Sequence, residues 1–227
     1  MAASLLRHEK KYVVTELCSS EIEALIKQNP ALFCEVFEVR RINNIYLDSV
    51  DFDNYKEHLA GVPQRLKIRI RWYGETFGPV RNPVLELKIK NNQFGKKQRF
   101  NLKPFVLDHD FNQKVLQKIF STSGLPEWLR QELALLQPTL LNSYIRKYFL
   151  SADRKCRITV DKNVVFFKLR KNDNNFTEMV DYQEMHIIEM KYSVQDEERA
   201  ALVASFLPFR LTNFSKYVHG VREINVI

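Results

Sequence analysis

The sequence predicts an α+β fold in which antiparallel strands close into a barrel and helices lie at its periphery. Two observations support this prediction. Eight or nine segments alternate polar and apolar residues with the period of a β-strand, and the segments between them show helical periodicity or turn-forming residues. Such regular alternation over many antiparallel strands is typical of a closed sheet. A third observation concerns the polar positions themselves, because nearly every strand fills them with Arg, Lys or Glu.

The first half of the chain is predicted to form five strands and two helices. Ser20 and Glu23 have the spacing of a capping box at the start of the first helix, which ends before Pro30. Gly61 and Pro63 stop the second helix. Turn-like connections join the last three strands, as in an antiparallel meander. The predicted strands are Arg7–Thr15, Val36–Leu47, Gln64–Tyr73, Pro83–Lys90 and Lys96–Leu102, and the second helix is Asp51–Leu59.

The second half is predicted to form four helices and four strands. Proline at position 126 favours a helix start there. The run Asn172–Asn175 predicts a loop, because Asn and Asp side chains favour turns. Neither a linker nor a repeat divides the sequence, so we expect a single domain over residues 1–227. The predicted helices are Phe111–Phe120, Pro126–Leu136, Gln195–Phe206 and Phe214–Val221, and the strands are Leu140–Leu150, Lys155–Asp161, Val164–Arg170 and His186–Tyr192.

The composition is that of an ordinary globular protein with an excess of positive charge. Hydrophobic residues make up 45% and charged residues 27% of the 227 residues. The net charge of +8 favours an anionic partner. Charged residues follow the start too soon for a signal peptide, and no apolar run reaches the ~20 residues of a membrane helix. We therefore expect a soluble, cytoplasmic protein without a membrane span.

The glycines exclude two common kinds of phosphate site. The six glycines stand far apart, so the chain contains neither a P-loop nor a dinucleotide-binding loop. The five histidines have no metal-ligand spacing. If the chain binds phosphate, side chains on strands must hold it.

A carboxylate followed two positions later by lysine occurs in three predicted strands. Residues two apart share one face of a strand, so each pair projects together. A further strand carries four cations on one face. Cations opposed on neighbouring strands repel each other, so such a sheet needs interleaved carboxylates, a metal-phosphate ligand or a polyanion. This requirement favours phosphate chemistry over faces that merely contact solvent. The segments are Glu9–Lys11, Glu86–Lys88, Glu189–Lys191 and Arg65–Trp72.

Eight short segments in a fixed order identify a family resemblance. They are Arg7–Tyr12, Asn44–Asp48, Arg69–Gly74, Leu85–Lys88, Ser143–Arg146, Arg157–Asp161, Ile188–Lys191 and Phe214–Gly220. In these segments the chain resembles the catalytic domain of the vacuolar transporter chaperone (VTC) polyphosphate polymerases, within the triphosphate tunnel (CYTH-like) superfamily. The resemblance implies a tunnel of eight antiparallel strands that binds ATP or another nucleoside triphosphate and a growing polyphosphate. It further implies transfer of the γ-phosphoryl group to polyphosphate with Mn²⁺ or Mg²⁺ as cofactor.

The resemblance also assigns roles to residues of this chain. It implies that Tyr144 and Ser215 donate hydrogen bonds to phosphate and that Glu189 binds the metal. The charge pattern adds Arg7 as a phosphate-binding cation and Glu9 and Glu86 as further metal ligands, since Mg²⁺ and Mn²⁺ bind through oxygen. The implied catalytic cations are Lys11, Arg69, Arg71, Lys88, Arg146, Arg157 and Lys191, and the implied phosphate-binding cations are Lys97, Arg99 and Lys216.

Two departures from the family pattern bear on the reaction. Arg7 stands where the hydrolytic branch of the superfamily carries a first glutamate, which leaves Glu9 alone and favours a polymerase over a triphosphatase. Asn213 stands where some family members carry lysine. An inorganic or nucleoside triphosphatase on the same tunnel and a non-catalytic polyphosphate-binding protein remain the alternatives. Nucleic acid is disfavoured, because the aromatic residues mostly alternate away from the charged faces.

Overall fold

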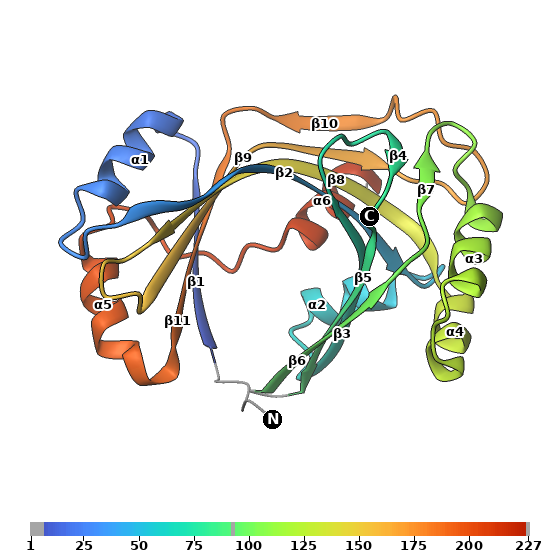
Figure 1. Ribbon diagram of the computed structural model, residues 1–227, viewed down its shortest axis with the longest axis horizontal. Coiled ribbons are helices and arrows are strands. Elements are labelled where there is room, and N and C mark those ends of the chain that lie inside the picture. Colours follow the sequence, from blue (N-terminus) through green and yellow to red (C-terminus); the bar gives the residue numbers. More distant parts are fainter. Residues whose placement is uncertain (1–6, 92–93, 226–227) are drawn as a thin grey trace. The chain divides into compact units, whose positions relative to one another are not determined.

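The computed structural model describes residues 7–91 and 94–225 of the chain (Figure 1). The strands are β1 (Arg7–Val14), β2 (Cys34–Asp48), β3 (Gln64–Tyr73), β4 (Gly78–Val80), β5 (Val84–Asn91), β6 (Phe94–Asn101), β7 (Phe105–Leu107), β8 (Gln137–Leu150), β9 (Cys156–Lys168), β10 (Met179–Tyr182) and β11 (His186–Ser193). The helices are α1 (Ser19–Lys27), α2 (Asp53–Leu59), α3 (Gln113–Thr122), α4 (Glu127–Ala134), η1 (Val194–Asp196), α5 (Glu197–Ser205) and α6 (Lys216–Asn225).

Nine strands belong to one large sheet with the order β1-β11-β9-β8-β2-β3-β5-β6, and β10 pairs with β9. β4 and β7 form a separate two-stranded sheet. The pairings with a described register, such as β3 with β5, are antiparallel. The predicted mixed fold with a large antiparallel sheet is therefore confirmed. The strand order has two ends, β1 and β6, so the closure predicted for the barrel is not among the pairings between described residues.

Several predicted elements differ from the observed ones. The two strands predicted at 155–161 and 164–170 are one strand, β9, whose residue Asn163 has a left-handed φ of 51° that interrupts the alternation. The loop predicted before His186 contains β10. The predicted capping box is wrong: the N–H of Cys18 donates to Glu21, at 2.8 Å, while Glu23 accepts from Lys147. In the part of the chain that is described, no helix has the length and apolar character needed to span a bilayer.

The chain forms two compact units made of discontinuous segments. Unit 1 comprises the residues up to Arg40, Tyr144–Val164 and Tyr182–Phe214. Unit 2 comprises Arg41–Ser143, Val165–Asp181 and the residues from Ser215 onward. Strands β2, β8 and β9 each contribute residues to both units. The single domain expected from the sequence stays a prediction.

The core of unit 1 lies where α1 and α5 pack on strands β1, β9 and β11 (Figure 1). Alternate strand residues such as Tyr12, Ile158 and Met190 are buried there, together with Ile22 of α1 and Val203 of α5. Alternation then directs the intervening residues of these strands to the other face of the sheet. Those positions are occupied by Glu9 and Lys11 of β1, Arg157 and Asp161 of β9, and Glu189 and Lys191 of β11.

Unit 2 has its own core beneath α3 and α4, which lie side by side (Figure 1). Ile68, Ile70 and Trp72 of β3 are buried with Leu116 of α3 and Leu129 of α4. Burying each such side chain stabilises the fold by about 1.5–3 kcal/mol. The four cations of β3 alternate with these residues and so project from the opposite face, as the sequence predicts.

A buried carboxylate fixes α6 within unit 2. Asp48 is fully buried and accepts hydrogen bonds from the backbone N–H groups of Ser49, Asn54 and Tyr55 at 2.8–3.0 Å. It also accepts a hydrogen bond from the hydroxyl of Tyr217 in α6. Burial, together with the adjacent carboxylate, raises the pKa of Tyr217, so this hydroxyl remains a donor. Asp48 thereby joins the start of α2 to α6.

Gly220 allows α6 to pack closely on the sheet. A Cβ added to it would lie 2.6 Å from Cδ2 of Leu140 and 2.8 Å from Cε1 of Phe166. Alanine normally stabilises a helix interior relative to glycine. Here we expect Gly220→Ala to lower the free energy of unfolding by about 1–3 kcal/mol through overpacking. Urea denaturation measures this change. Arg222→Ala, at an exposed position of α6, is the control and should leave stability nearly unchanged.

Candidate functional site

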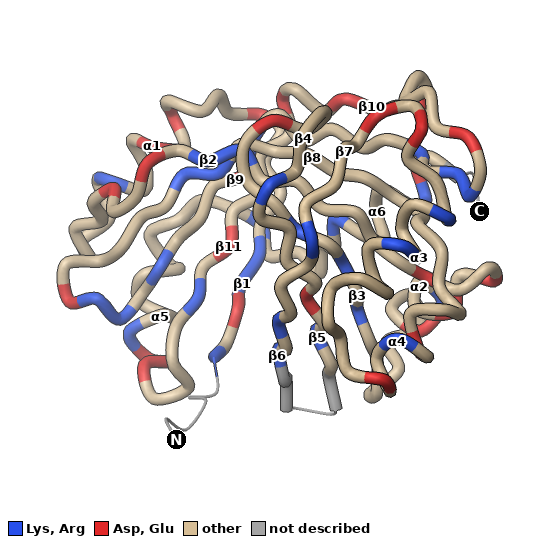
Figure 2. The backbone as a smooth tube through the Cα atoms, turned by 45° about the vertical axis from the view of Figure 1, so that its right-hand side comes forward, with Lys and Arg blue, Asp and Glu red and all other residues tan. Residues whose placement is uncertain are grey.

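The charged residues of β3, β5 and β6 form a continuous face in unit 2, and Figure 2 shows the Lys and Arg positions along these strands. Arg69 lies opposite Glu86, which in turn lies opposite Arg99. One step further along, Lys67 lies opposite Lys88, which lies opposite Lys97. Side chains of directly opposed residues project from the same face. The structure thus brings the predicted cations of these strands together.

Glu86 lies at the centre of this face, with 4% of its surface exposed. Its Oε2 accepts hydrogen bonds from Nε and Nη2 of Arg69, at 3.0 and 2.7 Å, and lies 3.7 Å from Nη1 of Arg71. Its Oε1 lies 2.6 Å from Nζ of Lys97 and 3.2 Å from Nε of Arg99. Four described cations therefore share one carboxylate. These contacts favour a counter-ion role for Glu86, whereas its predicted role as a metal ligand stays a prediction.

The pKa values of this cluster follow from burial and charge. Burial acts to raise the pKa of Glu86, but the charges of Arg69 and Arg71 and the hydrogen bonds from Lys97 and Arg69 outweigh it and lower that pKa to about 2. Burial lowers the pKa of Lys97 to about 8, although Glu86 opposes this shift. Lys97 is consequently the member of the cluster whose charge changes just above neutral pH. The cluster as a whole retains a surplus of positive charge.

A hydroxyl from the C-terminal part of unit 2 reaches the same face. Ser215 precedes α6, and its Oγ accepts a hydrogen bond from Nζ of Lys67 at 2.9 Å. The N–H of Val218 also donates to this oxygen, at 3.3 Å, so the first turn of α6 holds it in place. Lys216 is only 9% exposed. The structure therefore brings Ser215 to β3 through Lys67, one of the four cations that the sequence places on one face of this strand.

A second charged face lies on β1, β9 and β11 in unit 1. Glu9 lies opposite Lys191, and Lys11 lies opposite Glu189. Across the other edge of β11, Glu189 lies opposite Thr159, and Lys191 lies opposite Arg157. Unlike the face in unit 2, this one alternates carboxylates and cations. Arg7 lies at the exposed end of β1, opposite Ser193.

The carboxylates of Glu9 and Glu189 converge on one ammonium group. Nζ of Lys191 lies 2.9 Å from Oε2 of Glu189 and 3.7 Å from Oε2 of Glu9. Nζ of Lys11 lies 2.8 Å from Oε1 of Glu9 and donates to the carbonyl of Phe214 at 3.2 Å. Two carboxylates that approach one cation so closely offer oxygen ligands of the kind that Mg²⁺ and Mn²⁺ prefer. In donor chemistry, Glu9 and Glu189 therefore fit a divalent metal ion.

Arg146 is held rigidly by Asp161, which lies in the predicted segment Arg157–Asp161 but had no role assigned to it from the sequence. Its Nε and Nη2 donate to the two oxygens of Asp161 at 2.5 and 2.6 Å, a bidentate geometry, and Nη2 also lies 3.5 Å from Glu189. Burial acts to lower the pKa of Arg146, but Asp161 outweighs it, so the guanidinium stays charged. Its carbon Cζ lies 5.3 Å from the ring centroid of Tyr144. Asp161 carried a signal in the sequence, since it alternates with Arg157 on β9.

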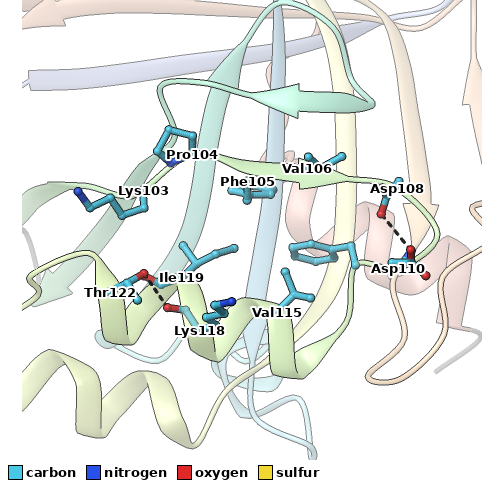
Figure 3. Close-up of a pocket in the computed structure, with 11 residues that line it drawn as sticks. Lys103, Pro104, Phe105, Val106, Asp108, Asp110, Val115, Lys118, Ile119 and Thr122 are labelled. Atoms are coloured by element: carbon cyan, nitrogen blue, oxygen red, sulfur yellow. Dashed lines mark hydrogen bonds between the residues drawn. The ribbon is translucent and has the colours of Figure 1, made fainter.

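A pocket in unit 2 lies apart from these residues. It has a volume of about 330 Å³ and lies between β7 and α3 (Figure 3). Phe105, Phe111 and Ile119 make it largely apolar, and none of the predicted site residues lines it. The nearby group Asp108, His109 and Asp110 is mostly exposed. Its two lysines, Lys103 and Lys118, are matched by Asp108 and Asp110, so the pocket lacks the surplus of positive charge found around Glu86.

Comparison with known proteins identifies one family and one related protein. The model of the VTC domain family matches residues 6–225. The chain is also 29% identical to vacuolar transporter chaperone complex subunit 2 of Saccharomyces cerevisiae, over an alignment that covers 56% of this chain and 18% of that subunit. The matched region is therefore a small part of the longer yeast protein. The resemblance to the VTC family, predicted from the eight ordered segments, is confirmed.

Solved structures share the fold at low sequence identity. The PH1819 protein of Pyrococcus horikoshii has a TM-score of 0.52 at 15% identity, with 96% of this chain and 98% of that chain covered. A putative adenylate cyclase of Vibrio parahaemolyticus has a TM-score of 0.52 at 13% identity, with coverages of 98% and 99%. A putative adenylyl cyclase from Hippeastrum, described as having a dominant triphosphatase activity, has a TM-score of 0.51 at 15% identity, with coverages of 95% and 96%.

The low pKa of Glu86 predicts how acid affects a Glu86→Gln variant. A carboxyl whose pKa is lower when folded stabilises the fold above its ordinary pKa of 4.5 and loses this effect as the pH falls toward about 2. At pH 7 we expect the variant to be less stable than wild type by about 2 kcal/mol, since one pKa unit corresponds to about 1.4 kcal/mol and exposed partners screen part of the shift. The difference should shrink below pH 4.

Chemical denaturation of both proteins between pH 7 and pH 3 measures this difference. Glu132→Gln, at an exposed position of α4, is the matched control and should follow wild type at every pH. A Glu86→Gln variant with a stability deficit that does not change with pH would contradict the counter-ion role.

Proposed function

Because this chain belongs to the VTC domain family, we propose that it is a metal-dependent polyphosphate polymerase, which transfers the γ-phosphoryl group of ATP to a growing polyphosphate chain. The observation that carries the proposal is the charge surplus around Glu86, where four described cations share one carboxylate. A polyanion is the ligand that relieves their mutual repulsion. Arg residues bind phosphate oxygens bidentately, and Lys acts as a point charge.

We also propose that the strands of the large sheet close into the eight-stranded tunnel implied by the sequence resemblance. The proposal is supported by the strict alternation on β3, where Arg69 and Arg71 share one face and Ile68 and Ile70 are buried on the other. A tunnel wall requires this separation on every strand.

Glu9 and Glu189 would hold the metal ion. The ion supplies positive charge between phosphate oxygens and so reduces the repulsion between two anionic reactants. Lys191, which contacts both carboxylates, would give up these contacts when the ion is bound. Asp161 would keep Arg146 oriented beside Glu189 throughout. Mn²⁺ and Mg²⁺ both suit this set of oxygens.

The residues of this chain would act by positioning and by charge neutralisation. A terminal oxygen of polyphosphate forms a bond to the γ-phosphorus of ATP while the bond from that phosphorus to the β–γ bridging oxygen breaks, and ADP leaves with that oxygen. The attacking oxygen is already anionic, so the step needs no general base. Arg69, Arg71 and Lys97 would hold the nucleotide phosphates, and Ser215 and Lys216 would bind further oxygens.

A triphosphatase on the same tunnel is the alternative. Asp161 favours it, because it adds a carboxylate that shares Arg146 with Glu189 in unit 1. Its two oxygens are, however, both bonded to Arg146. Hydrolysis would release free orthophosphate from ATP, whereas the polymerase releases ADP and polymer.

Incubation of the purified chain with ATP and Mn²⁺ should yield polyphosphate and ADP in proportion. Glu189→Gln should lower the rate at least about 100-fold, because mutations at or beside metal ligands commonly cost 10- to 100-fold or more. Gel analysis of the polymer and chromatography of the nucleotides measure both products. Glu198→Gln, exposed on α5 in the same unit, is the control and should keep the wild-type rate.

Two outcomes would contradict the proposal. Orthophosphate without polymer would favour the triphosphatase, and tight binding of tripolyphosphate without turnover would favour a non-catalytic binder. Polymer formation by Glu189→Gln at the wild-type rate would contradict the metal role of Glu189 alone.

The pKa of Lys97, about 8, predicts a pH dependence of phosphate binding. As the pH rises from 7 to 9, the ammonium of Lys97 loses its charge, so the affinity for metal-free tripolyphosphate should fall on the order of tenfold. The arginine of a Lys97→Arg variant keeps its charge over this range, so the affinity of this variant should change little between pH 7 and pH 9. Isothermal titration calorimetry at both pH values measures the affinities.

The ligand titrates equally in both experiments, so the comparison isolates Lys97. An identical pH dependence of wild type and Lys97→Arg would show that Lys97 does not contribute its charge to binding.

A further inference from the structure

Asn142 carries a buried hydrogen-bond donor without a partner. The residue lies on β8 in unit 2 and has 0% of its surface exposed. Its Oδ1 accepts a hydrogen bond from Nδ2 of Asn44 at 2.8 Å. Among the described residues, no acceptor lies within hydrogen-bonding distance of its own Nδ2. A buried donor left unpaired costs about 1–3 kcal/mol, so this atom calls for an explanation.

The orientation of this amide is fixed by Arg71. The guanidinium of Arg can only donate hydrogen bonds, and its Nε lies 2.8 Å from Oδ1 of Asn44. Oδ1 of Asn44 must therefore be the acceptor, which turns Nδ2 of Asn44 toward Asn142 as a donor. Asn142 must then accept through its oxygen and present its own Nδ2–H groups. The side chains of Arg71, Asn44 and Asn142 thus form a relay of hydrogen bonds that all run in one direction, and Nδ2 of Asn142 is the donor at its end.

The surroundings of the relay favour an anionic acceptor over water. Arg71 approaches Glu86 through Nη1, at 3.7 Å, so the relay starts in the cluster with surplus positive charge. A buried water needs two to four polar partners, including acceptors for its own hydrogens. The groups contributed by Arg71, Asn44 and Asn142 are already committed or are donors. A phosphate oxygen only accepts and so suits this donor better than water.

We propose that Nδ2 of Asn142 donates a hydrogen bond to a nonbridging phosphate oxygen of the bound polyanion, and that Asn44 and Arg71 orient it for this purpose. The inference rests on the proposed function, since it adds a ligand to the phosphate site of unit 2. A neutral amide in this position contributes direction where the neighbouring cations contribute charge. It would thereby help to fix the position of a polyphosphate along a face of equivalent cations.

Nuclear magnetic resonance on the wild-type chain tests the contact directly. The side-chain amide signal of Asn142, assigned from its absence in Asn142→Ala, should move on addition of tripolyphosphate. Calorimetry should show that Asn142→Ala binds tripolyphosphate about 10- to 100-fold more weakly, as expected for a lost hydrogen bond to a charged group. Neither measurement depends on turnover.

Asn43 provides a matched control, because it is also a fully buried asparagine and adjoins Asn44 on β2. Its Nδ2 donates to the carbonyls of Gly74 and Glu75, so it has partners within the fold. Asn43→Ala should lower stability and yet change the affinity of the folded protein less than about twofold.

The outcomes separate the two proposals. Binding of tripolyphosphate with an unmoved Asn142 signal, or with wild-type affinity in Asn142→Ala, would overturn this inference and leave the proposed function intact. A moved signal and weaker binding would support both. No binding of tripolyphosphate by the wild-type chain would overturn the proposed function and this inference together.

Discussion

Repulsion among like charges governs how the charged strands of this protein are arranged. Four described cations of unit 2 lie within 4 Å of the single carboxylate of Glu86, which offsets part of their mutual repulsion. The hydrophobic core beneath β3 supplies the stability that such a face cannot supply itself. Unit 1 resolves the same problem differently, because Glu9 and Glu189 alternate there with Lys11 and Lys191.

The two faces differ in the kind of ligand that their charges suit. A surplus of cations suits the binding of phosphate, whereas convergent carboxylates suit a divalent metal ion. Asp161 makes the charged face of unit 1 more rigid, since its two oxygens both accept hydrogen bonds from Arg146. Asp48 likewise fixes α6 through Tyr217. Ser215, which immediately precedes α6, accepts the hydrogen bond from Lys67. Buried carboxylates thus orient the groups of both units.

Alternation made most strands and the charged faces predictable from sequence, because a period of two needs only local information. The shared face of Arg69, Glu86 and Arg99 followed from it. Partner choice could not be predicted in this way, since the pairing of Arg146 with Asp161 or of Asn44 with Asn142 depends on which strands become neighbours. The sequence predicts two strands in place of β9 because Asn163 interrupts the alternating pattern. Closure of the sheet depends on long-range geometry, about which periodicity holds no information.

The lowered pKa of Lys97 has a consequence for covalent chemistry. Near pH 8 about half of its side chains are present as the free amine, the form that reacts with acylating and aldehyde reagents. Because its side chain is 37% exposed, this lysine offers a selective attachment point for a fluorophore or cross-linker. A fluorophore at Lys97 would lie within the cationic cluster around Glu86 and would respond to changes there.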